Sequence, residues 1–344
     1  MLVFVVRRLV WAVLLVAVIT LITFVIFLAI PNQVGSRQGL VGPNLQAQWH
    51  LQDQSLPGQY MTFLDHVARH GDLGSSTRQP LTVRAILTSA LPVTLSLVIG
   101  GTLLWLLIAF PIGLLSALRP RSLVDKGLMV LVLVGVSAHP VWLGLMLSYF
   151  FGFKWHVFPV AGYCDLHYSP TKLCGGPRYW AFHMILPWIT FALLFAALYA
   201  RMIRASVLEA LEEDYVRTAR AKGAGTWRVL RRHVLRNAIL PVVSMLGMDV
   251  GLAFGGAIFI ETVFDLPGMG QVLYRALTSN DQPVIMGVAL VVGLAVALAN
   301  VAADLVNCWI DPRVRLRGAG WARKPALRRR REPAQQPEVT ISAG

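Results

Sequence analysis

The chain alternates between long apolar runs and shorter stretches that hold most of its charged residues. Six of the runs are long enough to cross a bilayer as a helix, which takes about 20 residues. A helix satisfies its own backbone hydrogen bonds in hydrocarbon, so each run is expected to be a transmembrane helix. The pattern predicts an all-α fold with six spans: Leu9–Ile30, Ser89–Leu118, Gly127–Phe153, His183–Ala205, Asn237–Phe264 and Val284–Ile310.

Composition supports a single membrane domain. Of the 344 residues, 56% are hydrophobic and only 14% are charged, whereas soluble domains carry about 25% charged residues. We expect residues 1–312 to form the transmembrane domain. Residues 313–344 are rich in Arg, Pro and Gln and are predicted to be a basic, disordered cytoplasmic tail. Its run Arg328–Arg331 either contacts anionic lipid headgroups or is simply solvated.

The distribution of basic residues predicts the orientation in the membrane. With the N-terminus in the cytoplasm, 23 of the 31 Lys and Arg residues fall on the cytoplasmic side, as the positive-inside rule requires. Both termini are then cytoplasmic. The net charge of +14 follows from this bias, and nucleic-acid binding is not expected. The first run follows Arg7 and Arg8 and is too long for the apolar part of a signal peptide, so we interpret it as an uncleaved span.

Two of the three cysteines share one predicted outside loop. Cys164 and Cys174 lie ten residues apart there, and that compartment is oxidising, so a disulfide and two free thiols are both compatible with the sequence. Cys308 lies in an apolar run and is expected to be buried. The spacing of Cys and His in the loop matches no standard zinc pattern, so no metal site is predicted.

The cytoplasmic stretch 206–236 is longer than a connector between spans needs to be. Gly223 is a helix stop, because glycine tolerates the left-handed conformation at a helix C-terminus, and Thr226 is expected to cap a second helix. A helix–Gly–helix elbow suits docking against a partner or lying on the membrane surface. One apolar stripe is predicted on the first helix, from residues recurring every three or four positions: Val207, Leu208, Leu211, Tyr215 and Ala219.

The sequence from Glu213 to Gly223, EDYVRTARAKG, resembles the cytoplasmic loop of the permease subunits of ABC importers. It departs from the general pattern, with RTA at 217–219 where Glu-Ala-Ala is typical, and agrees with the peptide-permease branch. The order of further motifs extends the resemblance over roughly residues 1–317. These are RRL at 7–9, GDLG at 71–74, LP at 240–241, ETVF at 261–264, PGMG at 267–270 and DPR at 311–313. HPV at 139–141 differs from the Pro-Ser-Phe that relatives tend to have.

The resemblance implies a type I ABC importer fold in the bacterial inner membrane. It implies that this permease forms half of a peptide pathway with a homologous second permease, surrounded by membrane lipid. Two ATP-binding cassette ATPases would bind ATP and Mg, and an extracytoplasmic binding protein would deliver substrate. The chain itself holds no cofactor and is not an enzyme, since it lacks the G-x-x-x-x-G-K-[ST] phosphate loop. Dipeptides, oligopeptides, nickel chelates and other small solutes remain open.

The resemblance also assigns the segment Glu213 to Gly223 as the helix that couples to the ATPase. Tyr215 and Ala219 would supply the apolar contact, and Gly223 would set the elbow. Glu213, Asp214 and the other charges would orient the helix rather than supply most of the energy, because exposed ion pairs contribute only about 0–1 kcal/mol each.

The fifth span combines small residues with one carboxylate. Gly247, Gly251, Gly255 and Gly256 allow close helix packing, or they form a face that slides during gating. Asp249 lies near mid-membrane, where a carboxylate faces a partner or a water-filled cavity. A structural polar contact and a position on a hydrated pathway are both open.

The alternative function is an ion-coupled secondary transporter of small solutes, in which Asp249 and Asp304 would serve. The long cytoplasmic elbow and the absence of a doubled six-span architecture argue against it. A membrane enzyme would need a motif such as HExxH or GxSxG, which the chain lacks. A scaffold or insertion factor is the remaining alternative. ATP dependence of uptake separates the importer from all three.

Overall fold

The computed structural model describes residues 2–25, 55–137, 139–167 and 174–310. Apart from two isolated β-bridges, the regular elements in these ranges are helices. The predicted tail, 313–344, and the end of the first predicted span lie outside the described residues. The elements are α1 (Leu2–Phe24), α3 (Leu56–Asp65), η3 (His66–His70), α4 (Val83–Leu118), α5 (Leu123–Ser137), α6 (Pro140–Leu147), η4 (Ser148–Lys154), α7 (Pro177–Glu212), α8 (Asp214–Ala221), α9 (Thr226–Val229), η5 (Leu230–Val234), α10 (Leu235–Val263), α11 (Met269–Ser279) and α12 (Gln282–Ile310).

The all-α fold is confirmed, but the count of six spans is not confirmed within the described residues. Four helices are long and apolar enough to cross a membrane, and a bent pair makes up to five. The apolar part of α1 found in these residues, Val10–Phe24, is shorter than the roughly 20 residues of a span. The four helices are α4, α7, α12 and a continuous run from α9 through α10.

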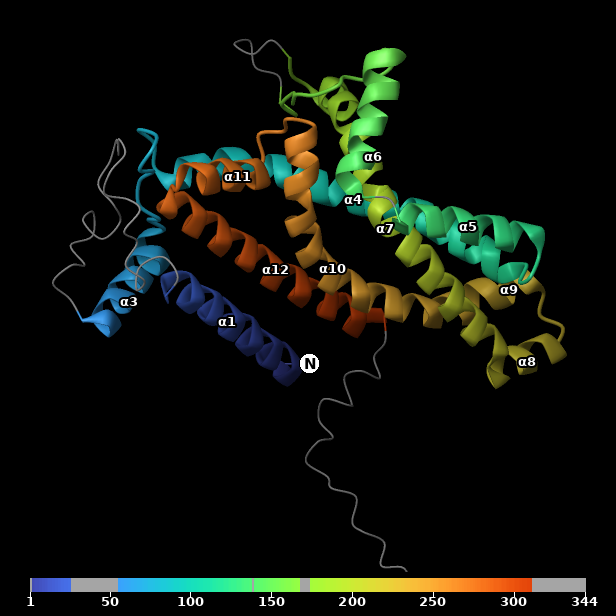
Figure 1. Ribbon diagram of the computed structural model, residues 1–344. Helices are drawn as coiled ribbons and strands as arrows, with labels where there is room; N and C mark the ends of the chain where they lie inside the picture. The colour runs from blue at the N-terminus through green and yellow to red at the C-terminus, as the bar shows by residue number, and fades with distance from the viewer. Residues whose placement is uncertain (1, 26–54, 138, 168–173, 311–344) are drawn as a thin grey trace, which may run out of the picture.

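The third predicted span, Gly127–Phe153, is wrong as one continuous helix. α5 ends at Ser137 and α6 begins at Pro140, and the segments Leu123–Gly135 and Pro140–Lys154 meet at a bend of 101°. The cause is local, because proline lacks an N–H and pushes the preceding residue out of the helical conformation. His139 is extended, and its Nδ1 accepts a hydrogen bond from the Val141 N–H at 3.3 Å, which caps α6. Figure 1 shows α6 rising away from the body of the bundle.

The most extensive helix pair is α4 with α7. A side chain at Gly113 would lie 2.6 Å from the carbonyl oxygen of Ala200, so the two backbones touch there. Trp105 is fully buried, with ring centroids of Phe195 and Tyr199 at 4.5 and 5.7 Å. Large rings opposite small residues let the two helices interlock along much of their length.

A second layer consists of α10, α12 and α1. A side chain at Gly247 of α10 would lie 2.5 Å from the Cβ of Ala303 on α12. On the other side of α12, Gly293 lies against Ile19 of α1. In Figure 1, α1 follows α12 along its length. Close packing over small residues is the usual way in which helices associate in lipid.

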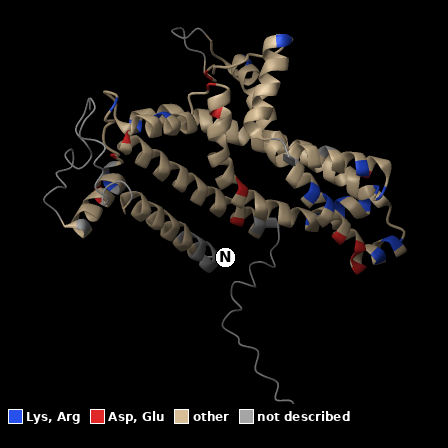
Figure 2. Ribbon diagram, viewed as in Figure 1, with Lys and Arg blue, Asp and Glu red and all other residues tan. Residues whose placement is uncertain are grey.

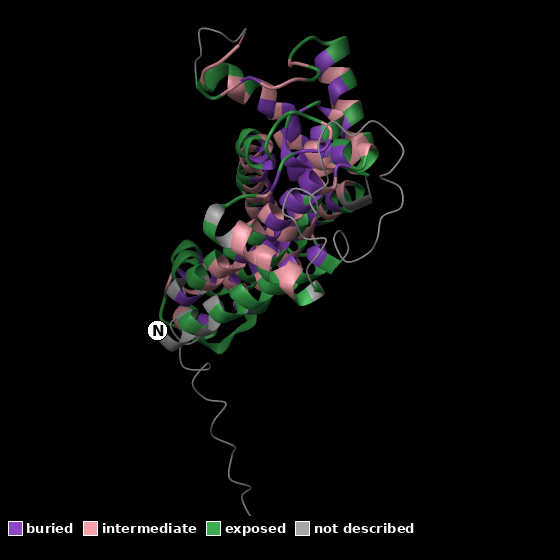
Figure 3. Cartoon of the chain, turned by 90° about the vertical axis from the view of Figure 1, so that its left-hand side faces the viewer, coloured by how far each residue is buried: buried purple, intermediate pink, exposed green. Residues whose placement is uncertain are grey.

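Buried, exposed apolar and charged residues are distributed as expected for a protein in a bilayer. Figure 3 shows buried positions running through the interior of the bundle and exposed positions around it. Many exposed positions are apolar, such as Leu107 on α4, which is 71% exposed. Figure 2 shows Lys and Arg gathered at the end of the molecule formed by α5, α8 and α9, with the middle of the long helices almost uncharged.

Candidate functional site

The predicted elbow is a short helix held between two breaks in the chain. α7 continues to Glu212, and Glu213 is extended, with φ −67° and ψ 146°. α8 then ends before Gly223, whose φ of +80° is the left-handed conformation that glycine adopts without strain. The prediction that Gly223 stops the helix is confirmed.

Two local predictions for the elbow are wrong. The first predicted helix is interrupted at Glu213, so the apolar stripe from Val207 to Ala219 does not lie on one helix. Thr226 is the first residue of α9 rather than its cap, and the cap position is Gly225, without a side-chain hydrogen bond. Hydrophobic periodicity does not register the extended Glu213, and capping preference favoured Thr226 although the extended cap residue is Gly225.

The buried side of α8 is centred on a residue that the sequence did not single out. Val216 is fully buried in the main core. Ala219 packs against the same core and is partly buried. Tyr215 is 37% exposed, and its hydroxyl oxygen accepts a hydrogen bond from Nδ2 of Asn237 at 2.9 Å. The apolar residues of α8 therefore hold it against its own chain.

The free side of α8 is charged. The side chain of Asp214 is 98% exposed, and Arg217 approaches it at 3.9 Å. Glu213, Arg220, Lys222 and Gly223 are also exposed. The exposed surface of α8 is thus a mixture of acidic and basic groups around a backbone turn.

A charged cluster just before the elbow was missed by the sequence reasoning. Nε and Nη2 of Arg204 on α7 donate to the two carboxylate oxygens of Asp125 on α5, each at 2.8 Å. The hydroxyl of Ser116 on α4 donates to the same carboxylate. A two-pronged pair of this kind fixes orientation as well as distance. It joins α4, α5 and α7 at the end of the molecule that carries the elbow.

The candidate pathway residues of α10 separate into three environments. Asp249 is 7% exposed and accepts a hydrogen bond from the Tyr199 hydroxyl of α7 at 2.8 Å. Gly251 faces Val296 of α12, to which an added side chain would come within 3.1 Å. An added side chain at Gly255 meets nothing within 4 Å, and at Gly256 it would only touch Phe191 at 4.0 Å.

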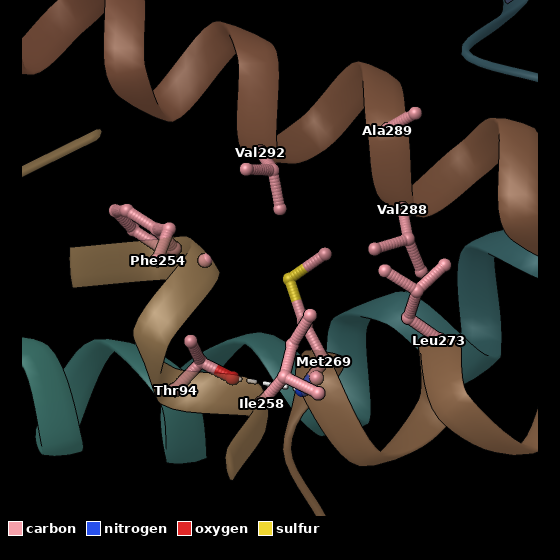
Figure 4. Close-up of a pocket in the computed structure, with 10 residues that line it drawn as sticks. Thr94, Phe254, Ile258, Met269, Leu273, Val288, Ala289 and Val292 are labelled. Carbon is pink, nitrogen blue, oxygen red and sulfur yellow. Dashed lines mark hydrogen bonds between the residues drawn. The ribbon is translucent and has the colours of Figure 1, made fainter. Parts of the chain in front are cut away.

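Open space lies beside the C-terminal half of α10. A pocket of about 160 Å³ is enclosed by α4, α10, α11 and α12, and in Figure 4 the side chain of Met269 projects into it. A larger cleft of about 450 Å³ lies between α4, α10 and α12 and is lined almost wholly by apolar side chains. Phe254 borders both. The smaller pocket is lined by Thr94, Phe254, Gly255, Ile258, Met269, Gly270, Leu273, Val288, Ala289 and Val292.

Glu261 explains the two outer motifs at 261–264 and 267–270. It is fully buried, and it accepts hydrogen bonds from the Thr94 hydroxyl at 2.6 Å and the Gln271 N–H at 3.0 Å. The Met269 N–H donates in turn to the Thr94 oxygen at 2.8 Å, the dashed line in Figure 4. An added side chain at Gly268 would lie 2.3 Å from the Glu261 carboxylate. A carboxylate inside an apolar run was the signal available in the sequence.

A second buried carboxylate anchors the loop before α4, which the sequence predicts to lie outside. Asp281 accepts hydrogen bonds from the hydroxyls of Ser76 and Thr77 and from the Thr77 N–H. Nε of Arg78 donates to the carbonyl oxygen of Ser279 at 2.8 Å. The loop that follows the GDLG motif is therefore fixed to the junction of α11 and α12.

The two loop cysteines are brought together. Cys164 and Cys174 form a disulfide with a Cα–Cα distance of 5.4 Å. His183 at the start of the membrane part of α7 lies beside it, with Nε2 3.7 Å from the Cys164 sulfur. The bond closes the loop that leads from η4 back into α7.

Comparisons with known proteins agree with this architecture. Residues 109–316 match the family described as "Binding-protein-dependent transport system inner membrane component". A protein of Brucella suis biovar 1 (strain 1330) that is named as a peptide permease is 40% identical over 273 residues, covering 79% of this chain and 83% of its own length. The dipeptide transport system permease protein of Escherichia coli (strain K12) is 34% identical over 320 residues, covering 86% and 94%. A chain of the MetNI methionine ABC transporter has a TM-score of 0.52 at 17% identity, over 66% of this chain and 97% of that one, which is a likeness of fold.

Proposed function

This chain belongs to the family of inner membrane components of binding-protein-dependent transport systems, and on that premise we propose that it forms half of a peptide pathway in an ATP-driven importer. The observation that carries the proposal is the elbow. A short helix is held between an extended residue, Glu213, and a left-handed glycine, Gly223, at the basic end of a multi-helix membrane protein. The chain is a permease and not an enzyme.

The energy for transport is expected to come from separate subunits. The chain has no phosphate-binding loop, so ATP and Mg would bind to two partner ATPases. We place their docking site on the exposed side of α8, with Asp214 and its charged neighbours at the contact. Tyr215 is hydrogen-bonded to Asn237 of α10, and Ala219 packs against the main core. Through these contacts the two residues would transmit motion of α8 into α10 and the core.

The orientation follows from the same assignment. The end with α8 and the α4–α5 turn would face the cytoplasm, and the disulfide loop would face outside, where a binding protein delivers substrate. Residues 1–312 would form the membrane domain and 313–344 a cytoplasmic tail. A homologous second permease would complete the pathway.

Within the pathway we assign different roles to the residues of α10. Asp249 is held by Tyr199, so its role is to fix α10 against α7. Gly251 is a packing position against α12. Gly255 borders unfilled space, and Gly256 faces only the ring of Phe191, which gives α10 room to move against α11 and α12 during gating.

The test is recovery of partners with the tagged chain from native membranes in mild detergent, followed by mass spectrometry. We expect a second permease and ATPases with phosphate-binding loops. Asp214→Lys should reduce recovery of the ATPases, because it reverses an exposed charge on α8. Glu209→Lys is the matched control, since it makes the same change at an exposed position on α7.

Recovery of the chain alone, under conditions that preserve a known importer, would contradict the proposal. Uptake by reconstituted vesicles that follows an ion gradient and ignores ATP would favour the secondary transporter instead. Equal loss of ATPase in both variants would retain the importer and remove α8 as the docking site.

A further inference from the structure

The segment after the elbow carries positive charge without any acidic residue. Between Tyr215 and Met248 the sequence contains no Asp or Glu. Four arginines of this segment are exposed, and we call them the arginine face: Arg228, Arg231, Arg232 and Arg236. Within the described part of the chain, none of the four forms an ion pair with a carboxylate. Their charge is therefore not neutralised by any carboxylate in the described residues.

The opposite side of the same segment is fixed to the core. Val229, Leu230 and Val234 are buried, at 1%, 2% and 0% exposure. They belong to the same main core as α4 and α7. Because these residues alternate with the arginines along α9 and η5, the arginine face is held outward by packing.

The length of the helix places the arginine face at the membrane boundary. Residues Thr226–Val263 form one continuous helical run of 38 residues, which is about 57 Å long at 1.5 Å per residue. The hydrocarbon core is only about 30 Å thick, so one end of the run must project beyond it. Arg236 is the last basic residue before the apolar stretch of α10. Arg228 to Arg236 therefore lie at headgroup depth and just beyond.

An aromatic residue marks the same level. Trp227, the residue before Arg228 in α9, is 67% exposed. Tryptophan is enriched where hydrocarbon meets water, because its ring is apolar and its N–H is polar. An exposed Trp beside unpaired arginines fits a lipid surface.

We propose that the arginine face, with Trp227, binds the headgroups of anionic phospholipids in the cytoplasmic leaflet. Guanidinium groups bind phosphate oxygens through two parallel N–H donors. The face differs from α8, whose exposed surface mixes acidic and basic groups and suits a protein partner. A lipid held at this point would steady the junction between the elbow and α10.

The experiment is native mass spectrometry of the full-length chain with its co-purifying subunits, delipidated and then titrated with dioleoylphosphatidylglycerol or dioleoylphosphatidylcholine. The wild type should retain phosphatidylglycerol in preference to phosphatidylcholine. The variant R228Q/R231Q/R232Q should lose that preference by on the order of tenfold to a hundredfold, because each basic residue at an anionic surface contributes roughly a fivefold gain. The control R217Q/R220Q/K222Q removes the same charge from α8 and should change retention by less than about twofold.

Additional measurements distinguish lipid binding from binding of free phosphate or of a protein partner. Inorganic phosphate at the same concentration should not displace the lipid, since it lacks the anchoring acyl chains. If the triple variant fails to fold, Arg231→Gln alone should still lower phosphatidylglycerol retention, and raising salt should weaken the wild-type preference. Equal retention of phosphatidylglycerol by the wild type and the R228Q/R231Q/R232Q variant would overturn the proposal. So would loss of the ATPase from that variant with lipid retention unchanged, which would make the face a protein-docking surface.

Discussion

At the scale of single residues, buried carboxylates hold the helices of this permease together. Asp125, Asp249, Glu261 and Asp281 are all less than 8% exposed, and each accepts hydrogen bonds from another element. Among these four, and within the residues that the structure describes, only Asp125 has a basic partner, Arg204. The other three rely on hydroxyl groups, with backbone N–H groups added at Glu261 and Asp281. Removing one carboxylate would leave at least one buried donor without its acceptor.

Replacing Glu261 with alanine should destabilise the outer end of the protein. The Thr94 hydroxyl and the Gln271 N–H would lose their acceptor, at a cost of about 1–3 kcal/mol for the unsatisfied groups. Thermal unfolding of the purified chain in detergent measures the effect. Glu261→Gln keeps an acceptor oxygen and should cost less, and Glu209→Ala, at an exposed position on α7, is the control. Equal stability of Glu261→Ala and Glu209→Ala would show that the network does not support the fold.

Residue 223 must be glycine because of its backbone conformation, since there is room for a larger side chain. A side chain added there meets nothing within 4 Å, yet φ is +80°, which costs an L-residue about 1–2 kcal/mol. Gly223→Ala should therefore shift or fray the elbow and reduce ATP-driven uptake. Gly225→Ala is the matched control, because it has equally open surroundings and a φ of −63°. If both variants transported alike, the elbow would tolerate another geometry at residue 223.

At the scale of elements, the glycines of α10 show that one stripe can serve two purposes. Gly247 and Gly251 face α12, whereas Gly255 faces unfilled space. The first pair lets the helices approach closely, because a side chain at Gly247 would clash with Ala303 and one at Gly251 would press on Val296. Gly255 leaves a hollow beside α11 that a moving helix can enter.

Two alanine variants separate these purposes. Gly247→Ala should lower the thermal stability of the chain, since its methyl group would lie 2.5 Å from the Cβ of Ala303. Gly255→Ala should leave stability unchanged or raise it by about 0.5–1 kcal/mol, because glycine weakens a helix interior. Uptake assays on the same variants then test gating. A loss of transport in Gly255→Ala at full stability is the expected signature of a residue that must pass close to a neighbour.

The junction of α4, α5 and α7 depends on the two-pronged Arg204–Asp125 pair. Arg204→Lys keeps the charge but cannot donate two parallel hydrogen bonds. It should lower the unfolding temperature, whereas Arg201→Lys, an exposed position one turn away on α7, should not. An unchanged unfolding temperature in Arg204→Lys would mean that charge alone holds the junction.

At the scale of the whole molecule, the two ends of the bundle differ in chemistry. One end carries the disulfide loop and the other carries α8 with most of the exposed arginines. The bond between Cys164 and Cys174 closes a short loop and should contribute about 2–3 kcal/mol. The remaining described cysteine, Cys308, is buried.

This asymmetry gives a direct test of orientation. After mild reduction of intact cells with a permeable outer layer, a membrane-impermeant maleimide should label Cys174, which is partly exposed, whereas Cys164 is buried. A cysteine introduced by Lys222→Cys, on the exposed elbow, should be labelled only after the inner membrane is opened. Labelling of both in intact cells, or of the elbow alone, would contradict the proposed orientation.

The sequence by itself determined the properties that depend on neighbours along the chain. The apolar runs predicted the helices, because hydropathy and helix length are local quantities. Gly223 predicted the end of α8, because left-handed φ is a property of one residue. The break at Pro140 was also local, but the apolar run continues across it, and hydropathy does not record backbone geometry.

Only the tertiary structure decided which side chains meet. Tyr199 and Asp249 are 50 residues apart, Thr94 and Glu261 are 167 apart, and Thr77 and Asp281 are 204 apart. Their pairing depends on how the helices pack against one another, which no local pattern encodes. The same holds for α8, where burial of Val216 fixes which side remains free. The sequence could therefore place the elbow, while the packing of α8 on α9 and α10 decided which of its residues a partner can reach.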